Sequence, residues 1–191
     1  MLLGSEGCAL ANRVESVMPR LPEPLLDQAT RETQNSVIEL CTRVHTEVGA
    51  AAEQLGQLRE ELADSIAKLG LRAASAGMHP FAIWEEIAVT SGDRQDFVYG
   101  SMGELARREP TFALHLHVGI GDPETAIKVH NRMRVHLPLL LALSANSPFW
   151  QGRDTGLASA RTPLFQAFPR VGVPRPFTDY AHYVRSVDLL I

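Results

Sequence analysis

Alternation of hydrophobic and polar positions predicts two strands. In residues 36–44, SVIELCTRV, isoleucine, leucine and valine share one face, and Glu39 lies on the other. In residues 111–119, TFALHLHVG, larger hydrophobic residues alternate with small residues and with His115 and His117. Successive side chains of a strand point to opposite faces, so each segment is expected to bury one face and to present the other to solvent or to a ligand.

A different periodicity predicts the helices. Leucine and isoleucine recur at spacings of three and four over residues 46–69, which indicates a long amphipathic helix ending near Gly70. Asp122 before Pro123 is a typical helix start, and Pro138 is expected to kink the helix that follows. The other expected elements are a strand end at residues 2–3, a short strand at 71–77, helices at 94–109 (ending before Pro110), 123–145, 162–168 and 177–190, and a loop at 146–160.

The order of these elements favours an α+β fold. Helices separate the strands, and the strands alternate in polarity rather than being apolar throughout. That pattern is typical of an antiparallel sheet whose helices cover one face. No repeat or domain boundary interrupts the sequence, so residues 1–191 are expected to form a single domain.

Composition narrows the functional classes. The net charge of −4 argues against a nucleic-acid surface, which normally needs an excess of basic residues. The longest apolar run, residues 137–145, is about half of a membrane span, and the apolar residues at the N-terminus follow no basic segment. Two cysteines, Cys8 and Cys41, do not make a disulfide framework. We therefore expect a cytoplasmic protein with no membrane or nucleic-acid partner.

Four side chains could bind a metal ion. His115 and His117 leave the same face of their strand, where both could bind a metal or one could bind a substrate. Glu32 and Glu39 would suit magnesium if they converged, because magnesium prefers oxygen ligands. Their spacing of seven separates them in a straight strand, so convergence requires Glu32 to lie in the preceding turn or a bulge to intervene. The alternatives are solvated side chains, or a hydrolytic metal site built on the two histidines.

The polar loop that follows residue 145 carries Arg153, with Arg161 just beyond it. Guanidinium groups there could hold phosphate or carboxylate groups through paired hydrogen bonds, or could simply be solvated. The pair of glycines at positions 119 and 121 does not complete a dinucleotide motif, because Glu124 stands where the third glycine would be.

Several segments resemble one family when taken in order: VIELCTRV, GMHPFA, LHLHVGIGDPETAIKV, LPLLLALSANSPFWQGRDTG and ASARTPLF. They are similar to the glutamate–cysteine ligase type 2 family of bacterial carboxylate–amine ligases. Residues 112–162 carry the most specific part of the resemblance, which extends from about Leu2 to the C-terminus. It implies a partial glutamine-synthetase-like fold. Members of the family begin earlier and continue further, so the chain is expected to be truncated at both ends.

The resemblance also implies a set of functional residues. The implied metal ligands are Glu32, Glu39 and His115; the implied substrate or ATP contacts are His117, Asn146 and Ser147; and the implied catalytic residues are Arg153 and Arg161. The cofactors would be ATP and Mg²⁺, and the substrates glutamate, cysteine or similar amino acids.

The implied reaction forms an amide through an acyl phosphate, which an amine then attacks. The alternative is a non-catalytic fragment, or a subunit that needs a partner chain. Self-association into a homo-oligomer is compatible with either expectation.

Overall fold

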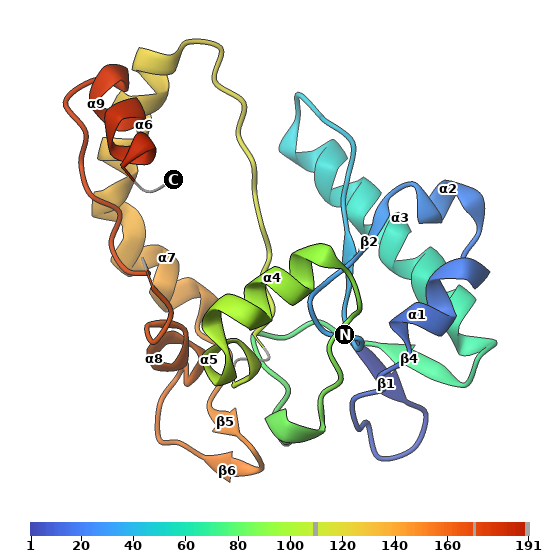
Figure 1. Ribbon diagram of the computed structural model, residues 1–191. Helices are drawn as coiled ribbons and strands as arrows, with labels where there is room; N and C mark the ends of the chain where they lie inside the picture. The colour runs from blue at the N-terminus through green and yellow to red at the C-terminus, as the bar shows by residue number, and fades with distance from the viewer. Residues whose placement is uncertain (109–110, 170, 190–191) are drawn as a thin grey trace.

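The apolar stripe predicted for residues 46–69 forms the buried face of helix α3 (Val48–Ala67). A computed structural model describes residues 1–108, 111–169 and 171–189 and shows α3 along one side of the molecule (Figure 1). Leu58, Leu62 and Ile66 of this helix are buried in the main hydrophobic core. The predicted helix is therefore confirmed, and its spacing of apolar residues is explained by the core that it covers.

The N-terminal segments complete this core. Strand β1 (Leu2–Gly4) pairs antiparallel with β4 (Leu71–Ala73), which directly follows α3. The short helices α1 (Val14–Val17), η1 (Met18–Arg20) and α2 (Glu23–Leu26) add further buried side chains. The expected strand end at residues 2–3 and the expected short strand after residue 70 are both confirmed.

A second antiparallel pair carries one of the predicted acids. Strand β2 (Ala29–Arg31) lies beside β3 (Ile38–Leu40), with Thr30 opposite Glu39. The strand predicted for residues 36–44 is thus present but shorter. Strand β2 was not predicted from the sequence, because only its first residue is buried and three residues give no clear alternation.

The turn between β2 and β3 is fixed by backbone hydrogen bonds from three other segments. The amides of Leu2, Val14 and Thr90 donate to the carbonyl oxygens of Ser36, Asn35 and Thr33, at 2.7, 2.9 and 2.9 Å. The amide of Asn35 in turn donates to the carbonyl of Ala88 at 2.8 Å. Buried backbone groups need such partners, so this turn joins the N-terminal strand, helix α1 and residues 88–90 into one unit.

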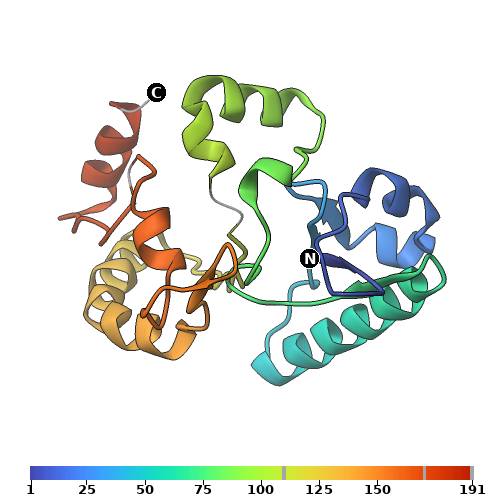
Figure 2. The ribbon, with the colours of Figure 1, turned by 90° about the horizontal axis from the view of Figure 1, so that it is seen from below.

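The remaining elements are, in order, η2 (Trp84–Glu86), α4 (Asp93–Met102), α5 (Glu104–Arg107), α6 (Pro123–Met133), η3 (Arg134–His136), α7 (Leu137–Ser144), β5 (Phe149–Trp150), β6 (Arg153–Asp154), α8 (Arg161–Phe165) and α9 (Tyr180–Asp188). Helices α6 to α9 lie on the opposite side of the molecule from α3, and α4 and α5 lie between the two groups (Figures 1 and 2). None of the described helices is long and apolar enough to cross a membrane.

Two predicted helices are interrupted. Gly103, with φ of 55°, separates α4 from α5 within the helix expected at residues 94–109. A positive φ is readily adopted by glycine, which explains the break there. The long helix predicted after Asp122 divides at η3, immediately before the turn that contains Pro138. The Asp122 side chain accepts a hydrogen bond from the Thr125 amide at 2.7 Å, as expected of an N-cap.

The last two predicted helices are present in shorter form as α8 and α9. The expected helix ends at residues 109–110 and 190 lie outside the described residues.

The strand predicted at residues 111–119 is wrong. After the bridge between Thr111 and Met78, residues 112–119 run extended without a neighbouring strand among the described residues. Leu114, Leu116 and Val118 are 83%, 77% and 74% exposed, so the face expected to be buried is open to solvent. Alternation sets the directions of the side chains, but a strand also needs a partner for its backbone hydrogen bonds.

The α+β class is confirmed, with a difference in the sheet. The described strands form three separate two-stranded antiparallel pairs instead of one sheet covered by helices: β1 with β4, β2 with β3, and β5 with β6. The likeness to glutamine synthetase stays a prediction.

Replacement of Ile66 by alanine is expected to destabilise the fold. The side chain is completely buried in the main core, so its loss removes apolar contacts and leaves a cavity, at a cost of about 2–5 kcal/mol. Urea unfolding measures this change. Leu139→Ala, at a side chain 59% exposed, is the matched control and should change the free energy of unfolding by no more than about 0.5 kcal/mol. Equal effects of the two substitutions would contradict the assignment of the core.

The N-cap of α6 predicts a pH-dependent stability. Hydrogen bonds with the side chain and the amide of Thr125 lower the pKa of Asp122 from its ordinary value of 3.8. A pKa that is lower in the folded state gives stability that is fully present above the unfolded-state value and is lost as the pH falls through the folded-state value. Thermal unfolding of Asp122→Ala should therefore show a lower melting temperature at neutral pH and a shrinking difference below about pH 4. Asp64→Ala, at an exposed site on α3, should show no such trend.

Candidate functional site

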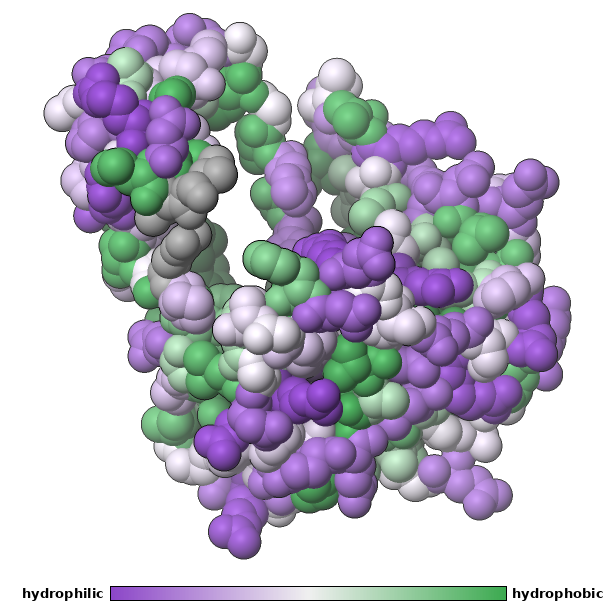
Figure 3. All heavy atoms as spheres, viewed as in Figure 1, coloured by the Kyte–Doolittle hydropathy of each residue, from purple (hydrophilic) through white to green (hydrophobic). Residues whose placement is uncertain are grey.

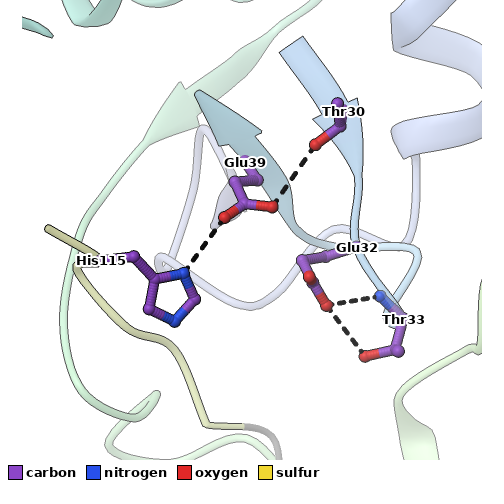
Figure 4. A network of polar contacts seen from close by, with 5 residues as sticks. All are labelled: Thr30, Glu32, Thr33, Glu39 and His115. Atoms are coloured by element: carbon purple, nitrogen blue, oxygen red, sulfur yellow. Dashed lines mark hydrogen bonds and ion pairs between the residues drawn. The ribbon is translucent and has the colours of Figure 1, made fainter. Parts of the chain in front are cut away.

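Glu39 and His115 meet in space although they come from distant parts of the chain. Glu39 lies on β3, and His115 lies on the extended segment at residues 112–119 (Figure 4). Their Oε1 and Nδ1 atoms are 3.4 Å apart. Both side chains are partly open to solvent, at 38% and 61% exposure, so the contact itself contributes little to stability. It does bring a carboxylate oxygen and an imidazole nitrogen to one accessible point.

The register of the β2–β3 pair places Glu32 on the same face as Glu39. Residues directly opposite in an antiparallel pair project to one side, and Thr30 stands opposite Glu39. Glu32, two residues after Thr30, points to that side as well. Its amide donates to the carbonyl of Val37 at 3.3 Å, which continues the pairing past the end of β2. Glu32 thus lies in the turn before β3, one of the two arrangements that the odd spacing allowed.

The two carboxylates have different partners. The Thr30 hydroxyl donates to Oε2 of Glu39 at 3.5 Å. Oε2 of Glu32 accepts hydrogen bonds from the amide and the hydroxyl of Thr33 at 2.9 and 3.3 Å (Figure 4). The Glu32 carboxylate therefore points to the β2–β3 turn. The structure therefore brings Glu39 and His115 together but leaves Glu32 directed elsewhere.

The donor atoms suit a divalent cation, with one adjustment. Carboxylate oxygens and an imidazole nitrogen are ligands that such cations accept. Among the described residues, however, no three histidine, cysteine, aspartate or glutamate side chains lie close enough together to hold a metal ion. To complete a set of ligands with Glu39 and His115, the Glu32 carboxylate would have to give up its hydrogen bonds with Thr33 and bind the cation instead.

The charge of Glu39 acts on the neighbouring thiol of Cys41. Cys41, two residues further along, has its thiol pKa raised by partial burial and by the charge of Glu39. A negative potential that disfavours a thiolate favours a cation for the same reason.

His117 lies beside His115, as predicted. Their ring centroids are 6.2 Å apart, with the ring planes at 87°. An extended backbone is enough to project residues 115 and 117 to one side, even though the segment is not part of a sheet. Both rings are exposed and available to a ligand.

The loop residues have mainly structural contacts. Ser147 is 4% exposed; its amide donates to the carbonyl of Ala158 at 3.2 Å, and its own carbonyl accepts from the Ala160 amide at 2.7 Å. Asn146 lies against Gly77, where an added Cβ would come within 2.5 Å of the asparagine Oδ1. These contacts close the loop against the segment that precedes His79. The predicted binding roles of Asn146 and Ser147 stay predictions.

Arg161 anchors the segment that carries the histidines. Its Nε donates to the carbonyl of Phe112 at 3.1 Å, and its guanidinium lies over the ring of Phe165 at 5.0 Å from the centroid. Arg153 lies in the β5–β6 hairpin and is exposed, and within the described part of the chain it forms no hydrogen bond or ion pair with Glu39 or His115. The two arginines therefore differ: one positions the site, and the other is accessible to a ligand.

Sequence reasoning missed three residues around the acids. Thr30 and Thr33 contact Glu39 and Glu32 directly. Tyr99 of α4 hydrogen-bonds with the Thr33 side chain; burial raises its pKa, and the charge of Glu32 adds to that rise. Alternation within TRE, residues 30–32, could have paired Thr30 with Glu32. Nothing in the sequence indicates that Tyr99 reaches this turn.

The comparisons with known proteins point to one family. The family model described as glutamate-cysteine ligase family 2 (GCS2) matches residues 7–191. A protein of Rubrobacter xylanophilus, provisionally named glutamate–cysteine ligase 2-1, is 43% identical over 95% of this chain and 48% of its own length. A Halobacterium salinarum protein named glutamate–cysteine ligase is 41% identical over 85% of this chain and 45% of its own length. The chain thus spans about half the length of the curated relatives that it matches.

Replacement of Arg161 by alanine is expected to lower stability by about 1–2 kcal/mol, because a hydrogen bond from a charged group to Phe112 and a contact with Phe165 are lost. Arg153→Ala, in the exposed hairpin, is the matched control and should stay within about 0.5 kcal/mol of the parent protein. Urea unfolding compares the two. A loss no larger than that of the control would contradict an anchoring role for Arg161.

Proposed function

The chain belongs to glutamate-cysteine ligase family 2, and from this membership we propose that it forms part of an ATP-dependent ligase that joins a carboxylate to an amine. The contact between Glu39 and His115 is the observation that supports this best. It presents a carboxylate and an imidazole that are both accessible to solvent. The relatives' names motivate glutamate and cysteine, or similar amino acids, as the substrates. We further propose that the protein acts in the cytoplasm.

The residues of the proposed site fall into three groups according to what each would bind. Glu39, His115 and Glu32 would hold Mg²⁺, which when bound neutralises charge on phosphate oxygens. His117, Asn146 and Ser147 would contact ATP or the substrates. Arg153 would bind a phosphate or carboxylate group as a planar donor pair, and Arg161 would act with it or keep the histidine segment in place.

The proposed reaction has two steps. An oxygen of the substrate carboxylate attacks the γ-phosphorus of ATP, ADP leaves, and an acyl phosphate forms. The nitrogen of the amine then attacks the acyl carbon, its proton passes to a base, and inorganic phosphate leaves as the amide forms. Neither step needs a nucleophilic side chain, because the protein's tasks are to position the reactants and to neutralise charge. The acids, histidines and arginines of the site suit those tasks.

A second candidate is a subunit or fragment that is inactive until another polypeptide completes it. The exposed leucines of the extended segment favour this reading. Leu114 and Leu116 alternate with the two histidines, so a strand added beside them would cover apolar side chains while leaving the histidines accessible. The same edge could join two copies of the chain. In the whole protein we propose a continuous sheet of the glutamine-synthetase-like kind, of which residues 112–119 would form one strand.

Titration calorimetry of Mg-ATP into the purified chain tests the ligase proposal. We expect binding that His115→Ala and Glu39→Ala each weaken by about tenfold or more, since each removes a direct ligand of the proposed metal. The matched controls are His136→Ala and Glu53→Ala, at exposed positions of η3 and α3, and they should keep the parent affinity. Equal affinity in all four variants, or no binding by the folded chain, would contradict a formed ATP site. In the latter case, recovery of binding on addition of a second polypeptide would favour the second candidate.

A further inference from the structure

A cavity of about 250 Å³ lies next to the turn that carries Glu32. It is bounded by that turn, by η2 and the residues that follow it, and by helices α4 and α5, which occupy the middle of the molecule (Figures 1 and 2). Its volume is below the roughly 300–1,000 Å³ of pockets for drug-sized ligands, so the cavity can hold only a smaller molecule. The lining residues are Gln34, Trp84, Glu85, Ile87, Val89, Tyr99, Glu104 and Arg107.

The lining combines apolar walls with charges of both signs. Ile87 and Val89 are half-buried. Arg107 is the cation of the lining, and its guanidinium lies over the ring of Tyr99 at 5.7 Å from the centroid. Glu85 and Glu104 are the acids of the lining, and both are exposed. Among the described residues, these three charged side chains make no ion pair within 4.0 Å. A cavity that carries charges of both signs suits a ligand that itself carries both.

The cavity and the proposed metal site share one turn. Glu32 lies on the same strand face as Glu39 but is hydrogen-bonded to Thr33, Thr33 also bonds to the hydroxyl of Tyr99, and Gln34 lines the cavity. Gln34 also pairs with Val89 through an isolated antiparallel bridge, which fixes the cavity wall to the turn. A ligand in the cavity would therefore lie next to the turn that carries Glu32, one of the proposed Mg²⁺ ligands.

We propose that this cavity binds the free α-amino acid that supplies the amine. This inference rests on the proposed ligase function and adds the place and the means of recognition. Arg107 would pair with the α-carboxylate, and Glu85 or Glu104 would hold the ammonium group before it loses its proton. A small side chain would pack against Trp84, Ile87 and Val89.

The orientation of Arg107 supports this assignment. Stacking on Tyr99 restricts the guanidinium before a ligand arrives, which reduces the entropy lost on binding. A planar guanidinium also matches a carboxylate with two parallel hydrogen bonds, which lysine does not reproduce.

The space-filling view shows polar and apolar surface close together over the middle of the molecule (Figure 3).

Calorimetry with L-2-aminobutyrate, an α-amino acid with a small apolar side chain, tests the proposal on the intact chain; without ATP and Mg²⁺ the amino acid can bind but cannot react. We expect saturable one-to-one binding in about the millimolar range, ordinary for so small a ligand. Arg107→Ala should weaken it by about tenfold or more, and Arg107→Lys should restore only part of the affinity. Arg94→Ala, at an exposed position on α4 outside the cavity, is the matched control and should bind like the parent. Thermal unfolding of each variant verifies that it is folded.

Changes in the ligand test the same idea without changing the protein. Butyrate, which lacks the ammonium group, and the methyl ester of 2-aminobutyrate, which lacks the carboxylate, should both bind at least about tenfold more weakly. Butyrate binding as tightly as the amino acid, equal affinity in Arg107→Ala, or no binding by the folded parent chain would overturn the proposal. The amino-acid titration contains no nucleotide, so its result is independent of the Mg-ATP titration. A chain that binds the amino acid but not Mg-ATP would refute the ligase function alone. A chain that binds Mg-ATP but not the amino acid would refute only this pocket.

Discussion

The hydrogen-bonded turn between β2 and β3 is the constraint on which both proposed sites depend. Three separate segments donate backbone hydrogen bonds to carbonyl oxygens of residues 33–36, and the turn donates one back to Ala88. A turn held in this way cannot shift its register without breaking several buried hydrogen bonds. The antiparallel register then follows, and with it the common direction of Glu32 and Glu39. Backbone hydrogen bonds from segments without a proposed catalytic role therefore fix the strand face on which the two acids lie.

The sequence predicted those parts of the fold in which local pattern and long-range packing agree. Helix α3 has a stripe of leucine and isoleucine with the helical period, and the structure buries that stripe. Asp122 was recognised as an N-cap because the chemistry of a cap is local. Strand β2 escaped prediction because three residues with one buried side chain carry no periodic signal. The contact of Tyr99 with Thr33 joins a helix to a distant turn, and no local rule encodes such a contact.

The same distinction between local pattern and long-range packing explains which features of the candidate site could be predicted. Alternation correctly placed His115 and His117 on one side, because side-chain direction depends only on an extended backbone. Burial of the opposite side was predicted wrongly, because burial depends on a neighbouring strand. The resemblance implied that Glu39 and His115 each bind a metal ion, whereas their contact is a finding of the structure, since nothing in the local sequence relates the two positions. The curated relatives are about twice as long as this chain, so a strand supplied by further polypeptide is a physically reasonable partner for the exposed leucines.

The two proposed sites need opposite electrostatics at short range. A metal that binds phosphate requires negatively charged ligands, which the carboxylates of Glu39 and Glu32 would supply. Recognition of an α-carboxylate requires a positive group, which would be repelled by the metal if both faced the same space. Arg107 meets this requirement from α5, where its guanidinium lies over the ring of Tyr99. Consecutive residues of one turn lie next to the proposed metal site and the cavity. The amine of the bound amino acid would therefore be close to the substrate carboxylate that reacts with ATP. The amino acid's own α-carboxylate would be held by Arg107. On this argument the turn is the element that would orient the amino acid, because its residues contact both environments at once.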